Sequence, residues 1–342
     1  MSHTETATRG VYVQTNEEGA NHLVAFARGL DGSLASLGSF ATGGSGDGVA
    51  HLTSQGSVVV TGDGRHVLVT NAGSGDLSLF AVSSAGAELV QTVPSGAAPK
   101  SVAERDGLVY VLNTGDPSLA GFRLAGGRLE QIPGSRRDLP EADPAQVGFS
   151  PDGSALVVTQ RGTDSIAVFP VAADGLLGAS HEVASSGPTP YGFAFTAAGT
   201  LVVTEAFGAA KGKAAASSYS FADGAVEPIS RSIGNGRSEI CWAVVTGDDR
   251  YAFTTNFADG AVSRYAIAAD GSLELEDAAA GIAVDGRTGL RDEDLSADGR
   301  YLYAVDADSR RVFGWAVGEE GSLEPIGSWD GLPATVAGLA AS

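Results

Sequence analysis

The chain has 342 residues, 48 of them glycine, and a formal net charge of −20 at pH 7. This acidic balance argues against nucleic acid and anionic membranes as partners, because both are bound through clustered Lys and Arg. No stretch approaches the roughly 18 apolar residues of a membrane span, and the first ten residues lack the apolar core of a signal peptide. We therefore expect a cytoplasmic monomer, and its single cysteine, Cys241, cannot form an internal disulfide.

One pattern recurs seven times along the chain. In HVLVTNAGSGDLSLFAV (66–82), an apolar run ends in Asn71, and a glycine-rich turn leads to a second apolar run. The residues that close the first run lie 42 to 55 positions apart and are Asn16, Asn71, Asn113, Gln160, Glu205, Asn256 and Asp306. Each copy holds several short apolar and β-branched runs bounded by Gly, Asp and Asn, without a helical period. This pattern predicts an all-β fold, the seven-bladed β-propeller.

In chain order, we expect one blade from 10–44 together with 333–342, followed by blades at 57–96, 101–139, 146–187, 192–236, 242–286 and 293–332. Turns such as SPDG (150–153) and SADG (296–299) would join the first strand of a blade to the second. The first copy begins with a second-strand sequence, whereas the end of the chain, LPATVAGLAAS, resembles a first strand. We predict that residues 335–339 close the ring as the innermost strand of the first blade, making 1–342 a single domain.

The strands of a blade alternate in direction, so the turn after each second strand and the link into each next blade meet at one end of the central channel. The varied residues of the sequence fall there, whereas the opposite end carries uniform DG turns. A substrate site is therefore predicted at the first end. Its predicted substrate-binding residues are Asn71, Asn113, Lys100, Gln146, Arg161, Tyr191, Arg237, Asn256 and Asp306.

The repeats SPDGSALVVTQ, TGDDRYAFTTN and SADGRYLYAVD resemble the lactonase-type seven-bladed propellers over essentially the whole chain. That family includes 6-phosphogluconolactonases and 3-carboxy-cis,cis-muconate lactonising enzymes, and SEICWAVVTGDDRYAFTTN looks most like bacterial members without an assigned reaction. The resemblance implies an active site of the form P-R-H, followed by N-E after the next strand. Here Pro144 matches the proline, whereas Ala145 and Gln146 replace Arg-His, and Gln160 and Arg161 replace Asn-Glu.

Substitutes for the missing groups are predicted from neighbouring blades. Glu205 is a carboxylate in a series of carboxamides, so a partly buried Glu205 could act as general base. His51, in the glycine-rich loop 42–56, is a candidate general acid. Arg291 is the third predicted catalytic residue, and an arginine at such a site can hold an anionic group by paired hydrogen bonds. Cys241 is interpreted as a small core residue.

Two functions from different classes stay open. The first is an enzyme that hydrolyses or forms a small anionic lactone, of the sugar-acid or muconate type, by general acid/base catalysis. The second is a non-catalytic propeller that binds a small ligand or a protein on the same face. No cofactor or metal is expected. The alternative is a Ca²⁺ ion held by oxygens of the second-strand ring, from Glu205, Asp306, Asn71, Asn113 and Asn256.

Overall fold

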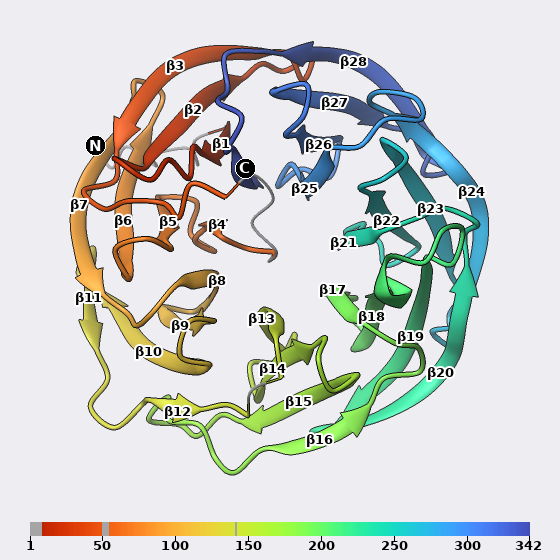
Figure 1. The fold of residues 1–342 in the computed structure, drawn as a ribbon, viewed down its shortest axis with the longest axis horizontal. Helices are drawn as coiled ribbons and strands as arrows, with labels where there is room; N and C mark the ends of the chain where they lie inside the picture. Colours follow the sequence, from red (N-terminus) through yellow and green to blue (C-terminus); the bar gives the residue numbers. More distant parts are fainter. Residues whose placement is uncertain (1–8, 50–54, 141) are drawn as a thin grey trace, which may run out of the picture.

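Seven antiparallel sheets stand around a central channel in the computed structural model, which describes residues 9–49, 55–140 and 142–342 (Figure 1). This confirms the predicted seven-bladed β-propeller. Each sheet is one blade, with its first strand at the channel and its last strand at the rim. The seven inner strands are β29 (Ala337–Ala341), β4 (Val58–Val60), β8 (Pro99–Arg105), β13 (Pro144–Phe149), β17 (Pro190–Phe195), β21 (Ile240–Val245) and β25 (Leu290–Leu295).

The remaining strands follow outward in each blade. The second strands are β1 (Gly10–Gln14), β5 (His66–Asn71), β9 (Leu108–Asn113), β14 (Ala155–Gln160), β18 (Thr200–Glu205), β22 (Tyr251–Asn256) and β26 (Tyr301–Asp306). The third strands are β2 (His22–Arg28), β6 (Asp76–Ser83), β10 (Ser118–Ala125), β15 (Ser165–Pro170), β19 (Ala215–Ala222), β23 (Ala261–Ile267) and β27 (Arg311–Val317). The outer strands are β3 (Leu34–Ala41), β7 (Gly86–Pro94), β11 (Arg128–Gln131) with the short β12 (Arg137–Asp138), β16 (His181–Ala184), β20 (Ala225–Gly234), β24 (Leu273–Ile282) and β28 (Leu323–Trp329).

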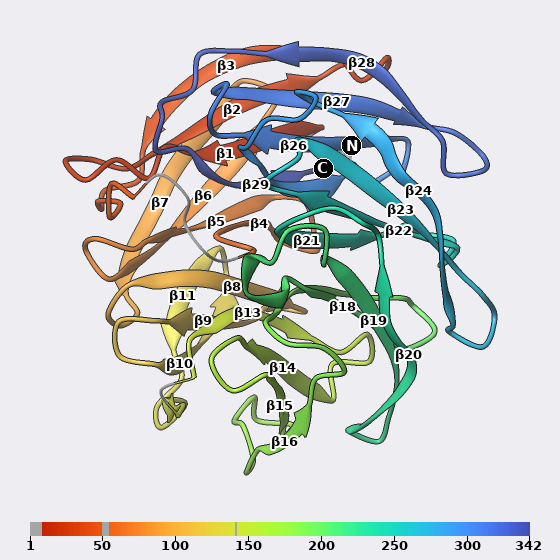
Figure 2. The ribbon, with the colours of Figure 1, turned by 45° about the vertical axis from the view of Figure 1, so that its right-hand side comes forward.

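The two ends of the chain close the ring in one blade. Strand β29 pairs with β1, with Ala340 opposite Tyr12 (Figure 2). The prediction of a C-terminal inner strand is thus confirmed, although the strand lies at 337–341, two residues beyond the predicted 335–339. Leu339 and Val13 belong to the same buried cluster as Tyr303 of the last blade, so closure buries apolar surface as well as two strand edges.

Short turns of one chemistry join the first and second strands. In four of them a Ser or Thr hydroxyl donates to the Asp two positions later, at 2.6–2.7 Å: Thr61 to Asp63, Ser150 to Asp152, Thr246 to Asp248 and Ser296 to Asp298. Such a bond fixes the turn and favours the ionised carboxylate. The pKa of Asp152 is accordingly lowered to about 2, mainly by its bond from Ser150. This end of the molecule is occupied by structural turns.

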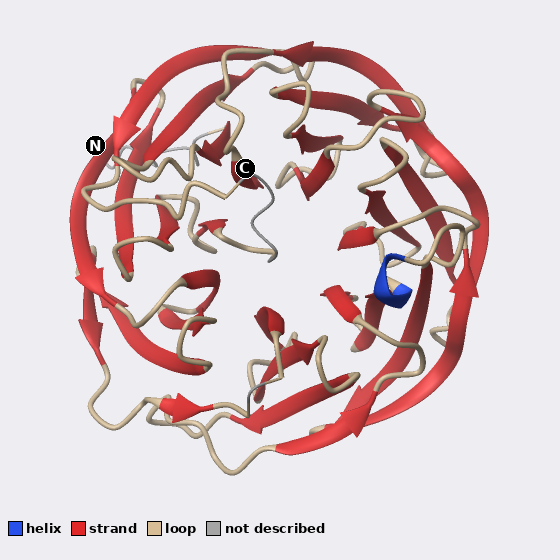
Figure 3. Ribbon diagram, in the orientation of Figure 1, coloured by secondary structure: helices blue, strands red, loops and turns tan. Residues whose placement is uncertain are grey.

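Strands make up nearly all of the regular structure (Figure 3). Among the described residues the one helix is the three-residue 3-10 helix η1 (Phe207–Ala209), in the loop between β18 and β19. No helix of that part of the chain is long and apolar enough to cross a membrane.

Candidate active site at the channel

The inner strands run in the same direction, so their second residues lie at one level near the end where each strand begins. We call five of these residues the upper ring: Lys100, Ala145, Tyr191, Cys241 and Arg291. This is the end of the channel at which the sequence predicted a site.

Arg161 reaches the upper ring from the turn after β14. Its guanidinium lies over the ring of Tyr191, 4.9 Å from the ring centre. Its Nη2 donates to Asp143 Oδ1 at 2.6 Å. Tyr191 in turn packs against Trp242, with ring centres 4.9 Å apart. Stacking on an aromatic face leaves the edge of a guanidinium able to bind an anion.

Arg291 supplies a second guanidinium to this end of the channel. Arg291 is 3% exposed, and its guanidinium lies 5.9 Å from the ring centre of Phe257. Burial raises the pKa of Tyr191 and of Cys241, while Arg291 and Arg161 lower both. Burial prevails, and the pKa of Cys241 is about 12, so its thiol is protonated at neutral pH. This end of the channel therefore offers the protonated phenol of Tyr191 and the guanidiniums of Arg161 and Arg291, whereas Cys241 supplies no thiolate.

Asp292 lies one residue deeper, on the same strand as Arg291. It is 2% exposed, and none of the described residues donates to either of its carboxylate oxygens in hydrogen-bond geometry. Burial raises its pKa to about 6, although Arg291, the Gly338 amide and the Trp242 indole each lower it. A buried carboxyl with few donors and a pKa near neutrality has the properties of an acid/base group.

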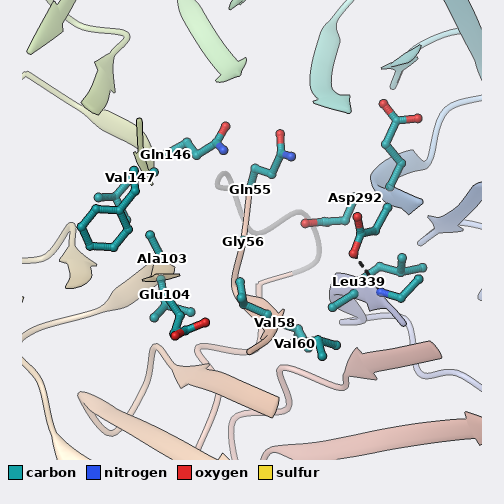
Figure 4. A pocket seen from close by; sticks show the side chains of 18 of the residues that line it. Gln55, Gly56, Val58, Val60, Ala103, Glu104, Gln146, Val147, Asp292 and Leu339 are labelled. Atoms are coloured by element: carbon teal, nitrogen blue, oxygen red, sulfur yellow. Dashed lines mark hydrogen bonds between the residues drawn. The ribbon is translucent and has the colours of Figure 1, made fainter. Parts of the chain in front are cut away.

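A cavity of about 370 Å³ extends from Asp292 along the second half of the inner strands. The side chains of Gln55, Gln146 and Asp292 surround its inner part (Figure 4). Its walls combine apolar residues, such as Val58, Val102 and Leu339, with charged ones: Glu104, Arg105, Glu293 and Asp294. The cavity lies toward the DG-turn end, so the concave space extends to the end opposite the one the sequence predicted.

The structure brings five predicted site residues to the channel. Arg161, Tyr191 and Arg291 lie close together at the upper ring, and Gln146 lines the cavity. The amide of Gln146 is already engaged by the neighbouring blade, since it accepts from Phe193 N at 2.6 Å and donates to Phe193 O at 3.1 Å. Lys100 also belongs to the upper ring, where its Nζ pairs with Asp47 at 3.3 Å.

Glu205 lies inside its blade, although the sequence placed it at the channel mouth. It has no exposed surface, and its oxygens accept hydrogen bonds from Gly187 N, Ser217 Oγ and Ser232 Oγ at 2.5–2.8 Å. Burial raises its pKa, while the two serine hydroxyls and the amide each lower it. Every carboxylate oxygen is occupied, so this geometry leaves no place for a substrate water.

The other residues that close second strands share this location. Asn71, Asn113 and Asn256 are fully buried and donate to a serine of the third strand in the same blade: Ser78, Ser118 and Ser263. Asp306 accepts from Ser309 N at 2.7 Å. The carboxamide series thus ties strands together within a blade. The residues considered for Ca²⁺ do not converge, and no group of three His, Cys, Asp or Glu suited to a metal occurs among the described residues.

Of the two remaining predicted residues, one lies away from the upper ring and the other is outside the described part of the chain. Arg237 Nε donates to Ala278 O on the outer strand β24 at 3.0 Å, which directs its side chain toward the rim. His51 lies outside the described residues.

Sequence reasoning missed Asp292 and Gln55. The signal for Asp292 was present, because RDED (291–294) puts four consecutive charged residues on a strand that lines the channel. Gln55 had no such signal, since its side chain makes hydrogen bonds with the backbone of Ala243, 188 residues away.

Comparison with known proteins agrees with this architecture. The family model for the seven-bladed β-propeller lactonases matches residues 108–206 and 204–330. A protein of unknown function from Desulfotomaculum acetoxidans has a TM-score of 0.76 at 14% identity, over 98% of each chain.

Two solved structures with enzymatic names also match. The periplasmic gluconolactonase of Pseudomonas aeruginosa has a TM-score of 0.71 at 18% identity, over 95% of this chain and 97% of that one. A candidate 6-phosphogluconolactonase from Bacteroides uniformis has 0.72 at 20%, over 97% and 99%. At these low identities the TM-scores show a shared fold alone. No curated protein matches the chain. Because the family model covers more than half of the sequence, the chain belongs to the seven-bladed β-propeller lactonase family.

Proposed function

We propose that this protein hydrolyses a small anionic lactone of the sugar-acid or muconate type at the upper ring. The observation that supports this most is that the Arg161 and Arg291 guanidiniums both lie near Tyr191, and that Arg291 also acts on the buried carboxyl of Asp292. The arginines hold the carboxylate or phosphate of the substrate through paired hydrogen bonds. The family and the enzymatic names of two structural neighbours favour lactone chemistry.

In the proposed reaction Asp292 is the general base. With a pKa of about 6 it is mostly ionised at neutral pH and accepts a proton from water as the water oxygen bonds to the lactone carbonyl carbon. The negative charge that develops on the carbonyl oxygen faces the guanidiniums and the Tyr191 hydroxyl, which burial keeps protonated. The ring C–O bond then breaks, and the leaving alkoxide takes the proton back from Asp292. Lactonisation would use the same groups in reverse.

A panel of lactones with and without a carboxylate or phosphate, assayed with and without EDTA, tests the proposal. We expect turnover only with the anionic members, independent of EDTA, and a kcat/KM that rises with pH through about 6 as Asp292 ionises. Loss of activity with EDTA and recovery with Ca²⁺ would favour the metal alternative instead. Saturable binding without turnover would favour the non-catalytic propeller.

A further inference from the structure

The indole of Trp242 is a buried hydrogen-bond donor without an acceptor among the described residues. Trp242 lies on the inner strand β21 and has no exposed surface, and no described group accepts from its Nε1 in hydrogen-bond geometry. A buried indole N–H usually has a partner, because an unpaired one has given up its hydrogen bond to water for nothing in return. The Trp242 indole therefore indicates an acceptor close by.

Asp292, on the neighbouring inner strand β25, is the complementary group. Both of its carboxylate oxygens are buried, and within the described part of the chain neither accepts a hydrogen bond. The Trp242 indole is nonetheless close enough to lower the pKa of Asp292, together with Arg291 and the Gly338 amide. A donor and an acceptor, both buried, thus lie near each other between two blades without being in hydrogen-bond geometry.

A β-bulge in each strand places the two side chains at matching positions. In both β21 and β25 the register shifts between the first and the fourth residue of the strand, and the third residue is Trp242 in one and Asp292 in the other. A bulge bends its strand and redirects the side chains, and bulges are frequent beside active sites. The indole and the carboxylate therefore come from equivalent places in adjacent blades.

The aromatic contacts of the upper ring hold Trp242 in place. Its ring packs against Tyr191, with ring centres 4.9 Å apart, and the Arg161 guanidinium lies over Tyr191. Strand β17 comes close at this point because it carries Gly192, where a Cβ would lie 2.9 Å from Trp242 Cα. The indole is thus packed between two inner strands and has little freedom to turn away from Asp292.

We propose that Trp242 is a positioning residue whose indole N–H orients the carboxylate of Asp292 and favours its ionised form. The hydrogen bond tightens when Asp292 carries its charge, because a donor binds a carboxylate more strongly than a neutral carboxyl. Trp242 touches no reacting atom and acts only through Asp292. The inference rests on the proposed function for the role of Asp292 as general base, whereas the pairing of indole and carboxylate can be tested without a substrate.

The experiment measures the ionisation of Asp292 by infrared spectroscopy in wild type and in Trp242→Phe. Arg291, Glu293, Tyr191 and Cys241 also interact electrostatically with Asp292, so its own signal is isolated by subtracting the spectrum of the same protein with Asp292→Asn. In wild type the carboxylate band should have its midpoint at about pH 6.

Trp242→Phe keeps an aromatic ring against Tyr191 but removes the N–H, so the midpoint should rise by about one pH unit, a roughly tenfold weaker preference for the ionised form. The rise of kcat/KM with pH on an anionic lactone should shift by the same amount. A midpoint that is unchanged in Trp242→Phe overturns the inference.

Trp315→Phe is the matched control. Trp315 is also buried, and its Nε1 likewise has no acceptor among the described residues, but it lies on the third strand β27 and packs against Phe313. This variant loses the same N–H from the same kind of site, so it should keep the wild-type midpoint. An equal shift in both variants would mean that the loss of any buried indole changes the titration, and the inference would fail.

A second readout leaves Trp242 in place and so serves even if Trp242→Phe does not fold. Tryptophan emission of the wild type should change with a midpoint at about pH 6, as the charge of Asp292 forms beside the indole, and Asp292→Asn should abolish this change. Emission that titrates identically in both proteins contradicts the pairing. If the midpoint shifts in Trp242→Phe but wild type hydrolyses no anionic lactone, the positioning of Asp292 stands and the proposed function fails.

Discussion

The interior of the blade formed by β17–β20, here called blade 5, and the channel face of β25 each hold a buried acid, and the two acids differ in their hydrogen bonds. Glu205 accepts three hydrogen bonds from its own blade. Asp292 is also buried, but within the part of the chain that the structure describes no donor meets its oxygens in hydrogen-bond geometry, and it lines a cavity. Burial raises the pKa of both. A raised pKa therefore does not distinguish them, whereas an unoccupied oxygen beside an open space does.

The largest effect expected from this comparison is on turnover. Asp292→Asn removes the proposed base with little change of shape, so kcat should fall by about 10²–10⁴-fold, the usual contribution of a positioned base. Steady-state kinetics on the best lactone of the panel would measure it, with the melting temperature as a check on folding. Glu205→Gln is the matched carboxyl-to-amide control and should keep wild-type turnover. The reversed result, with Glu205→Gln inactive and Asp292→Asn active, would identify Glu205 rather than Asp292 as the general base.

The second effect is on stability and is expected only in blade 5. Glu205→Ala leaves the hydroxyls of Ser217 and Ser232 and the Gly187 amide without their acceptor and adds a cavity, so the free energy of unfolding should drop by about 3 kcal/mol. Glu205→Gln keeps an acceptor and should lose less than about 1 kcal/mol. Urea denaturation of both variants measures the difference. Equal stability of Glu205→Ala and wild type would contradict a structural role.

The same contrast explains how far the sequence could lead. The seven repeats, the blade chemistry and the ring closure could be predicted because each depends on local strand and turn patterns that recur. The departure of Glu205 from a carboxamide series was equally visible, but the sequence does not show that Ser217 and Ser232 would enclose it. Arg161, Tyr191 and Arg291 could be predicted because the strand alternation places them at one end. The hydrogen bonds between the Gln55 side chain and the Ala243 backbone could not be predicted, because these residues are 188 positions apart and only the folded ring brings them together.

The third effect is on substrate affinity at the upper ring. Arg161→Ala removes one charged partner of the substrate anion, and a hydrogen bond to a charged group contributes about 1.5–3 kcal/mol, so KM should rise roughly 10- to 100-fold. The change in kcat should be smaller, because Asp292 is untouched. Arg250→Ala, which breaks an exposed pair with Asp248 at the DG-turn end, is the control and should leave KM unchanged. An equal loss in both variants would mean that overall charge, rather than the upper ring, attracts the substrate.

The smallest effect is on the pH dependence of stability and concerns Glu293, next to Asp292 on β25. It is 3% exposed, and burial raises its pKa well above the ordinary value, although the Thr255 backbone offsets part of the rise. The folded protein thus keeps this proton above about pH 4.3, where an unfolded glutamate ionises. Its contribution to stability is complete below that pH and is lost as the pH rises through the folded pKa.

Asp292 and Asp294, with pKa values of about 6 and about 7, act in the same direction, so the melting temperature should fall between pH 5 and pH 8. Glu293→Gln stays neutral in both states and should melt above wild type at pH 8, with the difference shrinking toward pH 5. Thermal unfolding across this range measures it, with Glu274→Gln, an exposed carboxyl on β24, as the control that keeps the wild-type slope. A Glu293→Gln curve parallel to that of wild type would mean that Glu293 is already ionised in the folded protein. The acids of β25 would then be stabilised by hydrogen-bond donors, as Glu205 is in blade 5.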